Sequence, residues 1–336
     1  MSTYSGKITR NFYWFLTFIF AVSFLGKAQA QTCFTSEDMD ASVHTALETT
    51  ANNFLSMVAR GDVASLKQNA AASLASNFAG IEGVIDDNKA NLSGATGTAR
   101  PPYLLKLDGT APSARAEFLC GVFGANGQTS NSAVFVLNNL VPGSYGIEVL
   151  DVKTAKAPYT VSFVLQQEGA SWKLGGLLVK AMQINGHDGN WFLDKARTYK
   201  TQNKLHNAWF YFIEAHSLLT PVDFMSTQST DKLYDEAQTA KPTDLPPMDL
   251  AAANAKTYKL IAMYPLLVGT DLDLIVKFQS ADVSNSGQAF QDNMAVMKAL
   301  IAKYPEFRDA FDGVVARATE TSGHDYGTML PMKEIK

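Results

Sequence analysis

The sequence predicts an α+β protein, with N-terminal helices packed in a curved antiparallel sheet of about six strands, then a helical hairpin and a small ββαα module. Two observations carry this prediction. Apolar residues recur near every 3.6 positions between residues 42 and 88, but at every second position between residues 103 and 183. The helical period returns after residue 189. Separate blocks of helices and strands are typical of an α+β fold.

The first thirty residues have the order of a secretory signal peptide. Lys7 and Arg10 precede an apolar run, Phe12 to Gly26, and small residues ending at Ala30 follow. Since a membrane span needs about 20 apolar residues, cleavage after Ala30 is favoured over retention as an anchor. We therefore expect a periplasmic or secreted protein that contacts a membrane only if this segment is retained.

The mature chain is acidic. Without Lys7, Arg10 and Lys27 it carries 25 basic and 32 acidic residues, a net charge of −7. Nucleic acid and anionic bilayers reward clustered Lys and Arg, and the sequence shows no such cluster. We therefore expect neither as a partner.

The mature chain has two cysteines, Cys33 and Cys120. In an oxidising compartment they could form a disulfide that pins the N-terminal arm to a strand. Alternatively, both are unpaired and Cys120 is a small apolar side chain in the core. The sequence leaves both alternatives open.

Helical spacing extends from Ser42 to Arg60, where Gly61 ends the helix and Asp62 is placed to cap the next one. Helical spacing then continues to about Asn88. A segment rich in Gly, Thr and Pro, residues 91–102, indicates a loop.

Alternating apolar residues, separated by turn residues, then predict an antiparallel meander. The strands are expected near residues 103–107, 116–122, 134–136, 145–149, 159–165 and 171–183. In the last of these, Trp172 and Leu174 have one parity, while Leu177 and Val179 have the other. A β-bulge at Gly175-Gly176 would put all four on one face and bend the sheet, whereas a strand buried on both faces is the alternative.

This combination of helices and curved sheet resembles the nuclear-transport-factor-2-like superfamily over residues 40–184. The helix end Phe54–Asp62 and the strand Ser171–Leu174 carry the resemblance. The resemblance implies a cone whose sheet wraps around a helix and encloses a pocket. Members include isomerases, dehydratases and many proteins without catalysis.

After Gly186–Gly189, with Asp188 placed as an N-cap, the chain is expected to form a helical hairpin. Its small and aromatic residues resemble a single tetratricopeptide repeat, although Ala196 replaces the usual glycine and Pro221 comes one position late. One repeat cannot cover its own apolar face, so we expect it to dock on the remainder.

Two strands, 257–268 and 271–279, and two helices are expected to follow a Pro-rich linker. The second helix is expected to begin at Pro305 and to carry Phe307, Phe311, Val314 and Val315. The predicted organisation is therefore a signal peptide at 1–30, the cone at 31–185, the hairpin at 186–240, the linker at 241–249 and the ββαα module at 250–336.

Two similar corners suggest a metal site. His187 and Asp188 lie between glycines, as do His324 and Asp325, and imidazole and carboxylate together suit zinc. The alternative is that each Asp forms a turn or a cap and each His is exposed. The turn interpretation is favoured, so no metal or other cofactor is expected.

An acid–base site in the cone is the enzymatic possibility, because burial tunes the pKa of a pocket carboxylate or imidazole. Asp40, His44 and Asp151 are the weak candidates. Glu117 and Glu148 alternate with apolar residues and are expected to face solvent unless the sheet is covered on both sides.

Other catalytic motifs are missing from the sequence, including a phosphate loop and His-Glu-x-x-His. The favoured function is therefore a non-catalytic protein that binds a small apolar molecule or a protein partner through its cone and hairpin. Trp209, Tyr211 and Trp172 are candidates for that surface, and hydrophobic docking of the hairpin is the alternative role. An enzyme like ketosteroid isomerase or a dehydratase, and a structural subunit of the cell envelope, are the other hypotheses.

Overall fold

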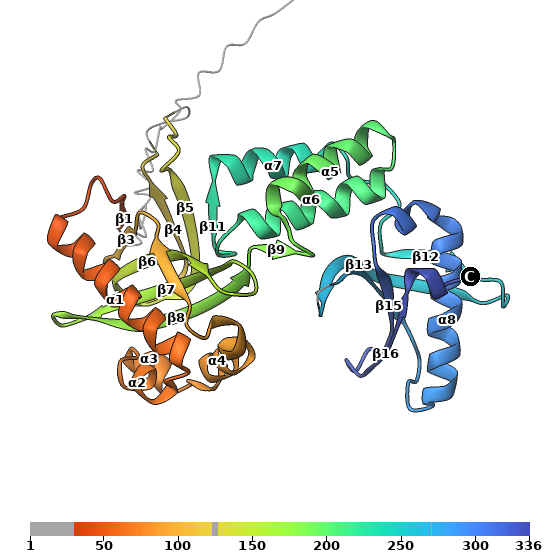
Figure 1. Cartoon of the computed structure of the whole chain (residues 1–336), viewed down its shortest axis with the longest axis horizontal. Helices are drawn as coiled ribbons and strands as arrows, with labels where there is room; N and C mark the ends of the chain where they lie inside the picture. The colour runs from red at the N-terminus through yellow and green to blue at the C-terminus, as the bar shows by residue number, and fades with distance from the viewer. Residues whose placement is uncertain (1–29, 123–126, 270) are drawn as a thin grey trace, which may run out of the picture.

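The α+β class is confirmed. The computed structural model describes residues 30–122, 127–269 and 271–336, in which two sheet-containing parts flank a group of helices (Figure 1). Apart from Ala30, the predicted signal peptide lies outside the described residues. None of the described helices combines the length and apolar composition needed to cross a membrane.

The first domain, residues 31–184, is built on a six-stranded antiparallel sheet in the order β1-β3-β6-β7-β8, with β2 also paired to β6. Its strands are β1 (Gln31–Phe34), β2 (Thr96–Ala99), β3 (Tyr103–Leu107), β6 (Gly143–Lys153), β7 (Tyr159–Glu168) and β8 (Ser171–Ala181). Because β2 and β3 pair with successive halves of β6, that strand is central and covered along its length.

A second sheet covers one face of the first. It contains β4 (Ser113–Cys120), β5 (Ala133–Leu140) and β11 (Met225–Thr227) in the order β11-β5-β4. The predicted continuous meander is therefore wrong, because β3 pairs with β6 and the β4–β5 hairpin leaves the sheet. Burial explains the change: Phe118 and Phe135 share a core cluster with Ile147 of β6. A disulfide between Cys33 and Cys120 joins β1 to β4.

Helices cover the other face. They are α1 (Ala41–Arg60), α2 (Val63–Gln68), α3 (Ala72–Ala75) and α4 (Ala79–Leu92). Gly61 ends α1 at φ 66°, and the Asp62 carboxylate accepts the Ser65 N–H at 3.1 Å as the N-cap of α2. Three short helices thus replace the continuous helical spacing predicted after Asp62.

The predicted bulge in β8 is confirmed. Leu165 pairs with Leu174 but Val164 pairs with Gly176, so Gly175 is the extra residue. Trp172, Leu174, Leu177 and Val179 consequently all contact the core cluster beneath α1.

The helical hairpin consists of α5 (Gly189–Thr201) and α6 (Leu205–Leu219), and it follows β9 (Gln183–Ile184) and β10 (His187–Asp188). As predicted, Asp188 caps α5 by accepting the Trp191 N–H at 2.9 Å. A third helix, α7 (Gln228–Gln238), packs beside α6.

The C-terminal module, residues 248–336, has a five-stranded sheet in the order β12-β13-β14-β15-β16. Its elements are β12 (Met248–Ala251), β13 (Thr257–Val268), β14 (Asp271–Gln279), α8 (Ser286–Lys303), η1 (Pro305–Asp309), β15 (Gly313–Thr319), β16 (Asp325–Pro331) and η2 (Met332–Glu334). Since β14 and β15 are parallel, α8 is the crossover helix between them.

The predicted second helix of the ββαα module is wrong beyond Asp309. Only one 3₁₀ turn, η1, forms there, and the chain then enters β15. Val314 and Ala316 are buried in the core while Val315 faces the other side of the sheet, which is the period of a strand.

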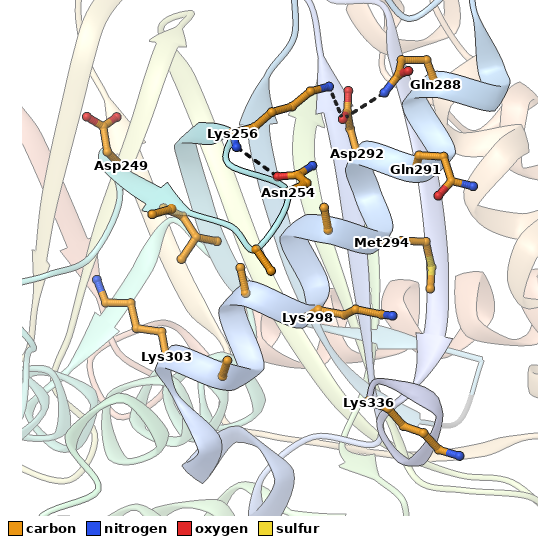
Figure 2. Close-up of a pocket in the computed structure, with 16 residues that line it drawn as sticks. Asp249, Asn254, Lys256, Gln288, Gln291, Asp292, Met294, Lys298, Lys303 and Lys336 are labelled. Atoms are coloured by element: carbon orange, nitrogen blue, oxygen red, sulfur yellow. Dashed lines mark hydrogen bonds and ion pairs between the residues drawn. The ribbon is translucent and has the colours of Figure 1, made fainter.

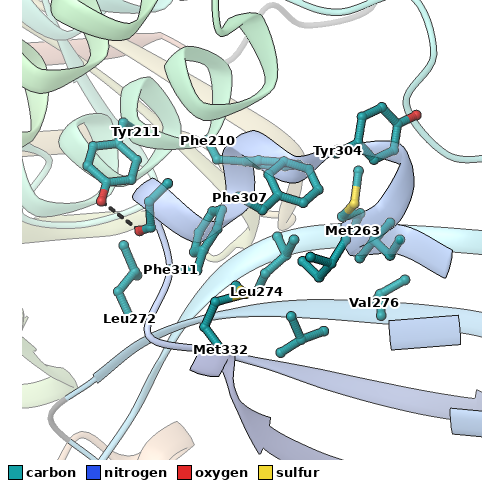
Figure 3. Close-up of a cluster of buried hydrophobic side chains, with 14 of the residues drawn as sticks. Phe210, Tyr211, Met263, Leu272, Leu274, Val276, Tyr304, Phe307, Phe311 and Met332 are labelled. Atoms are coloured by element: carbon teal, nitrogen blue, oxygen red, sulfur yellow. Dashed lines mark hydrogen bonds between the residues drawn. The ribbon is translucent and has the colours of Figure 1, made fainter. Parts of the chain in front are cut away.

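The hairpin and the C-terminal module share one core. Phe210 and Tyr211 of α6 meet Phe307 and Phe311 above the apolar face of the sheet (Figure 3). The Tyr211 hydroxyl donates to the Ala310 carbonyl at 2.6 Å. The hairpin therefore docks as expected, and its main apolar contacts are with the module.

Candidate functional site

The weak catalytic candidates lie on the surface of the first domain. Asp40 is exposed at the start of α1, and His44 lies 3.8 Å from Glu48. Asp151 pairs with Arg100 at 2.6 Å. The His44 N–H donates to the Asp40 carbonyl within the first turn of α1, but among the described residues no side-chain hydrogen bond or ion pair joins any two of Asp40, His44 and Asp151. The structure therefore does not assemble them into an acid–base site.

Glu148 is the main correction. The sequence predicted an exposed side chain, but Glu148 is 0% exposed and neither carboxyl oxygen has a hydrogen-bond partner among the described residues. The alternation of Glu148 with apolar residues predicted a solvent-facing side chain, but both faces of β6 are covered in the structure. Burial, with a smaller contribution from the charge of Glu48, raises the pKa of Glu148 to about 8. Glu117, in contrast, is exposed as predicted and pairs with Arg115.

The residues of the two predicted metal corners have other contacts. The His187 ring stacks on Trp191 at 3.7 Å, and Asp188 caps α5. Arg317 holds Asp325 at 2.7 Å, while His324 is exposed. In the described part of the chain, no group of three or more His, Cys, Asp or Glu side chains could hold a metal ion.

The predicted aromatic surface is only partly available. Tyr211 is buried, and its hydroxyl donates to the Ala310 carbonyl, which favours the docking role for this residue. Trp209 packs at the edge of the same core, with Lys241 Nζ 5.4 Å from its ring. Trp172 packs against the core of the first domain. These contacts fit the docking alternative.

A groove of about 1120 Å³ lies instead between β12 and α8 (Figure 2). One wall is the stripe of α8 that carries Ala295, Ala299 and Ala302, spaced one and two turns apart. These small side chains leave room above the helix. The opposite wall is β12, whose Asp249, Leu250 and Ala251 line the groove.

β12 is an edge strand, and within the described part of the chain the backbone groups on its outer side have no partner strand. The Ala252 N–H bonds the Lys256 carbonyl, and the register pairs Leu250 with Tyr258. Along an antiparallel ladder, residues whose backbone groups bond the neighbouring strand alternate with residues whose backbone groups point away from it. The N–H and C=O groups of Asp249 and Ala251 therefore point away from β13. These groups form a template for one further strand.

The two ends of the groove differ in charge. At one end Asp292 accepts hydrogen bonds from Lys256 at 2.9 Å, Tyr258 at 2.7 Å and Gln288 at 3.2 Å. Burial raises the pKa of Asp292, but these hydrogen bonds outweigh it and leave the pKa lowered. Toward the other end lie Lys298 and Lys303.

Lys336 also lines the groove, so three exposed lysines border it in an otherwise acidic protein. Sequence reasoning missed this cluster because position 336 is remote from α8 in the chain. The alanine stripe at 295, 299 and 302, flanked by lysines at 298 and 303, was the available signal.

Comparisons of the chain with protein-family models, curated proteins and solved structures give no match.

Proposed function

We propose that this is an exported, non-catalytic protein that binds an extended segment of a protein partner in the β12–α8 groove. The free edge of β12 beside the alanine stripe of α8 is the observation that carries the proposal. An added strand would bond the outward groups of Asp249 and Ala251. Alternate side chains of the added strand would then point toward α8.

The groove favours a particular segment. Small side chains at 295, 299 and 302 accommodate medium-sized apolar residues at every second position of the partner. Lys298, Lys303 and Lys336 make the groove positively charged, which attracts an acidic segment without direct pairing, whereas Lys256 and Asp292 neutralise each other. The partner segment is therefore extended, with alternating apolar and acidic residues.

Within the proposal, the first domain is a nuclear-transport-factor-2-like cone and the hairpin is tetratricopeptide-like. In this proposal the first domain and the hairpin are a scaffold that supports the C-terminal module. The filled core beneath α1 supports this role, because twenty buried apolar side chains occupy the space between the helices and the sheet.

Glu148 supports a second candidate, an isomerase-like or dehydratase-like enzyme, because a buried carboxyl with a raised pKa suits general acid–base chemistry. A cavity of about 550 Å³ lies between α1 and the start of β8. The enzyme candidate ranks second, since Glu148 lines neither this cavity nor the β12–α8 groove. A substrate would need α1 to move before it could reach the carboxyl.

The probe for the favoured function is a fluorescein-labelled hexapeptide of alternating Glu and Val, titrated by fluorescence polarisation. Wild-type protein is expected to bind it at one saturable site. Ala299→Trp fills the groove, and Lys298→Glu with Lys303→Glu reverses its charge. Each change is expected to weaken binding at least tenfold.

Two exposed positions supply matched controls. Ala90→Trp on α4 repeats the tryptophan substitution away from the groove, and Lys232→Glu on α7 repeats one of the two charge reversals there, so binding should be retained in both. Circular dichroism verifies that every variant is folded. Absence of saturable binding by wild-type protein, or equal loss in the controls, contradicts the proposal.

A further inference from the structure

A second cavity, of about 680 Å³, lies where the first domain meets the hairpin. One wall is a single face of β5, on which Val134, Val136 and Asn138 alternate with residues of the opposite face. The other wall is one stripe of α6, formed by Ile213, His216, Ser217 and Thr220. The segment 223–226 closes one side.

Hydrogen bonds hold the two walls in place. The Val136 N–H donates to the Phe224 carbonyl at 2.9 Å, next to the pairing of β5 with β11. Lys180 of β8 donates to the carbonyls of Ser217 and Thr220, each at 2.9 Å, and so ties the last turn of α6 to the first domain. The cavity is therefore formed before any ligand arrives.

The lining combines an apolar body with a few polar groups. Val134 and Val136 face Ile213, which is 36% exposed. Thr220 is only 4% exposed, yet its Oγ1 has no hydrogen-bond partner among the described residues. A buried polar atom left without a partner is costly, so a donor placed beside it would be favourable.

His216 adds a second polar group. Burial, and then the charge of Lys180, lower the pKa of His216 despite the opposing charges of Asp231 and Asp223. The ring is therefore neutral at pH 7 and presents one nitrogen as an acceptor. Lys180 and Asp223 lie 3.5 Å apart as an ion pair beside the cavity, so their charges offset each other and favour neither a cationic nor an anionic ligand.

We infer that this cavity between β5 and α6 binds a small uncharged molecule with an apolar body and one hydroxyl or N–H donor. The apolar body would lie between the valines of β5 and Ile213, and the donor would face Thr220 and His216. No residue of the β12–α8 groove takes part, so this site is independent of the proposed function.

N-phenylnaphthylamine is a suitable probe, because it is uncharged, has one N–H donor and fluoresces more strongly in apolar surroundings. Titration of the full chain is expected to show one saturable site. Val136→Trp and Ile213→Trp block the cavity from opposite walls and should each weaken binding at least tenfold. Ile261→Trp, at an exposed position of the C-terminal module, is the control and should leave binding unchanged.

The donor is tested separately. Thr220→Val keeps the side-chain shape and removes Oγ1, so it should weaken binding of the probe several-fold. It should not weaken binding of the N-methyl derivative, which lacks the donor. Absence of saturable binding, or blocking variants that bind as wild type does, would overturn the site. Equal binding of both probes by wild-type protein would overturn the role of the donor.

Discussion

The first domain and the C-terminal module both pack helices on a sheet, but they treat the rest of the sheet differently. In the first domain the β4–β5–β11 sheet covers the second face, and the disulfide Cys33–Cys120 holds edge strand β1. In the module, α8, η1 and the hairpin cover one face only. Leu266 and Met329 remain 47% and 52% exposed, and β12 keeps a free edge.

The difference suggests that the first domain provides stability, whereas the C-terminal module provides the surface for recognition. A sheet covered on both faces offers a partner no apolar face, and its edge strand β8 is met at Leu174 by the segment that contains Asn69 and Ala71. The module offers outward-pointing backbone groups at β12, beside a helix whose small side chains leave space. The resemblance to a pocket-forming superfamily pointed to the first domain, whereas the geometry places the accessible groove in the part for which the sequence suggested no family.

Removing the disulfide of the first domain is expected to have the largest effect on stability. The double variant Cys33→Ala, Cys120→Ala opens a loop of 87 residues and should lower the free energy of unfolding by about 4 kcal/mol. Denaturant unfolding measures this loss. Peptide binding by the module should survive under native conditions, and loss of that binding would contradict the independence of the two parts.

Phe307→Ala tests whether the hairpin and the C-terminal module unfold as one cooperative unit. Phe307 is fully buried and its ring lies 6.1 Å from Phe210 and 5.8 Å from Phe311. The cavity left behind should cost about 3 kcal/mol. Hydrogen exchange should show faster opening of both α6 and β14. Faster exchange confined to the module would show that the two do not share a cooperative core.

Glu148→Gln tests whether the Glu148 carboxyl is buried in the core of the first domain. The pKa of Glu148 is raised to about 8, so the folded state retains a proton that the unfolded state has lost. This contribution to stability is complete below the unfolded pKa and is lost as pH rises through the folded pKa. Between pH 5 and pH 7 wild-type stability should fall by about 2 kcal/mol from this group.

The glutamine variant cannot titrate, so its stability should vary less over the same interval. Urea unfolding at several pH values measures the difference. Glu117→Gln, an exposed change in the same domain, should leave the pH dependence unchanged. An unchanged pH profile in Glu148→Gln would show that the carboxyl is not buried in solution.

Local signals in the sequence predicted local structure well. Gly61, Asp62 and Asp188 fix helix ends through their own backbone and side-chain bonds, and Gly175 reveals the bulge because parity changes across it. These features depend on a few neighbouring residues. The sequence therefore sufficed for the class, most elements and the hairpin.

Features that depend on distant segments were not predictable in this way. The burial of Glu148 requires α1 and the strands around β6, and the strand character of Val314–Ala316 depends on pairing with β14 and β16. The groove needs Lys336 to lie beside a helix that ends at Lys303. The spacing of apolar residues along the sequence does not predict which distant segments contact each other.

Residue-resolved amide hydrogen exchange with the Glu-Val hexapeptide tests the central claim most directly. The outward amides of Asp249 and Ala251 should exchange quickly in the free protein and become protected when the peptide is added. The amides of edge strand β16, at the opposite side of the same sheet, should not change. Protection at β16 without protection at β12 would contradict the account.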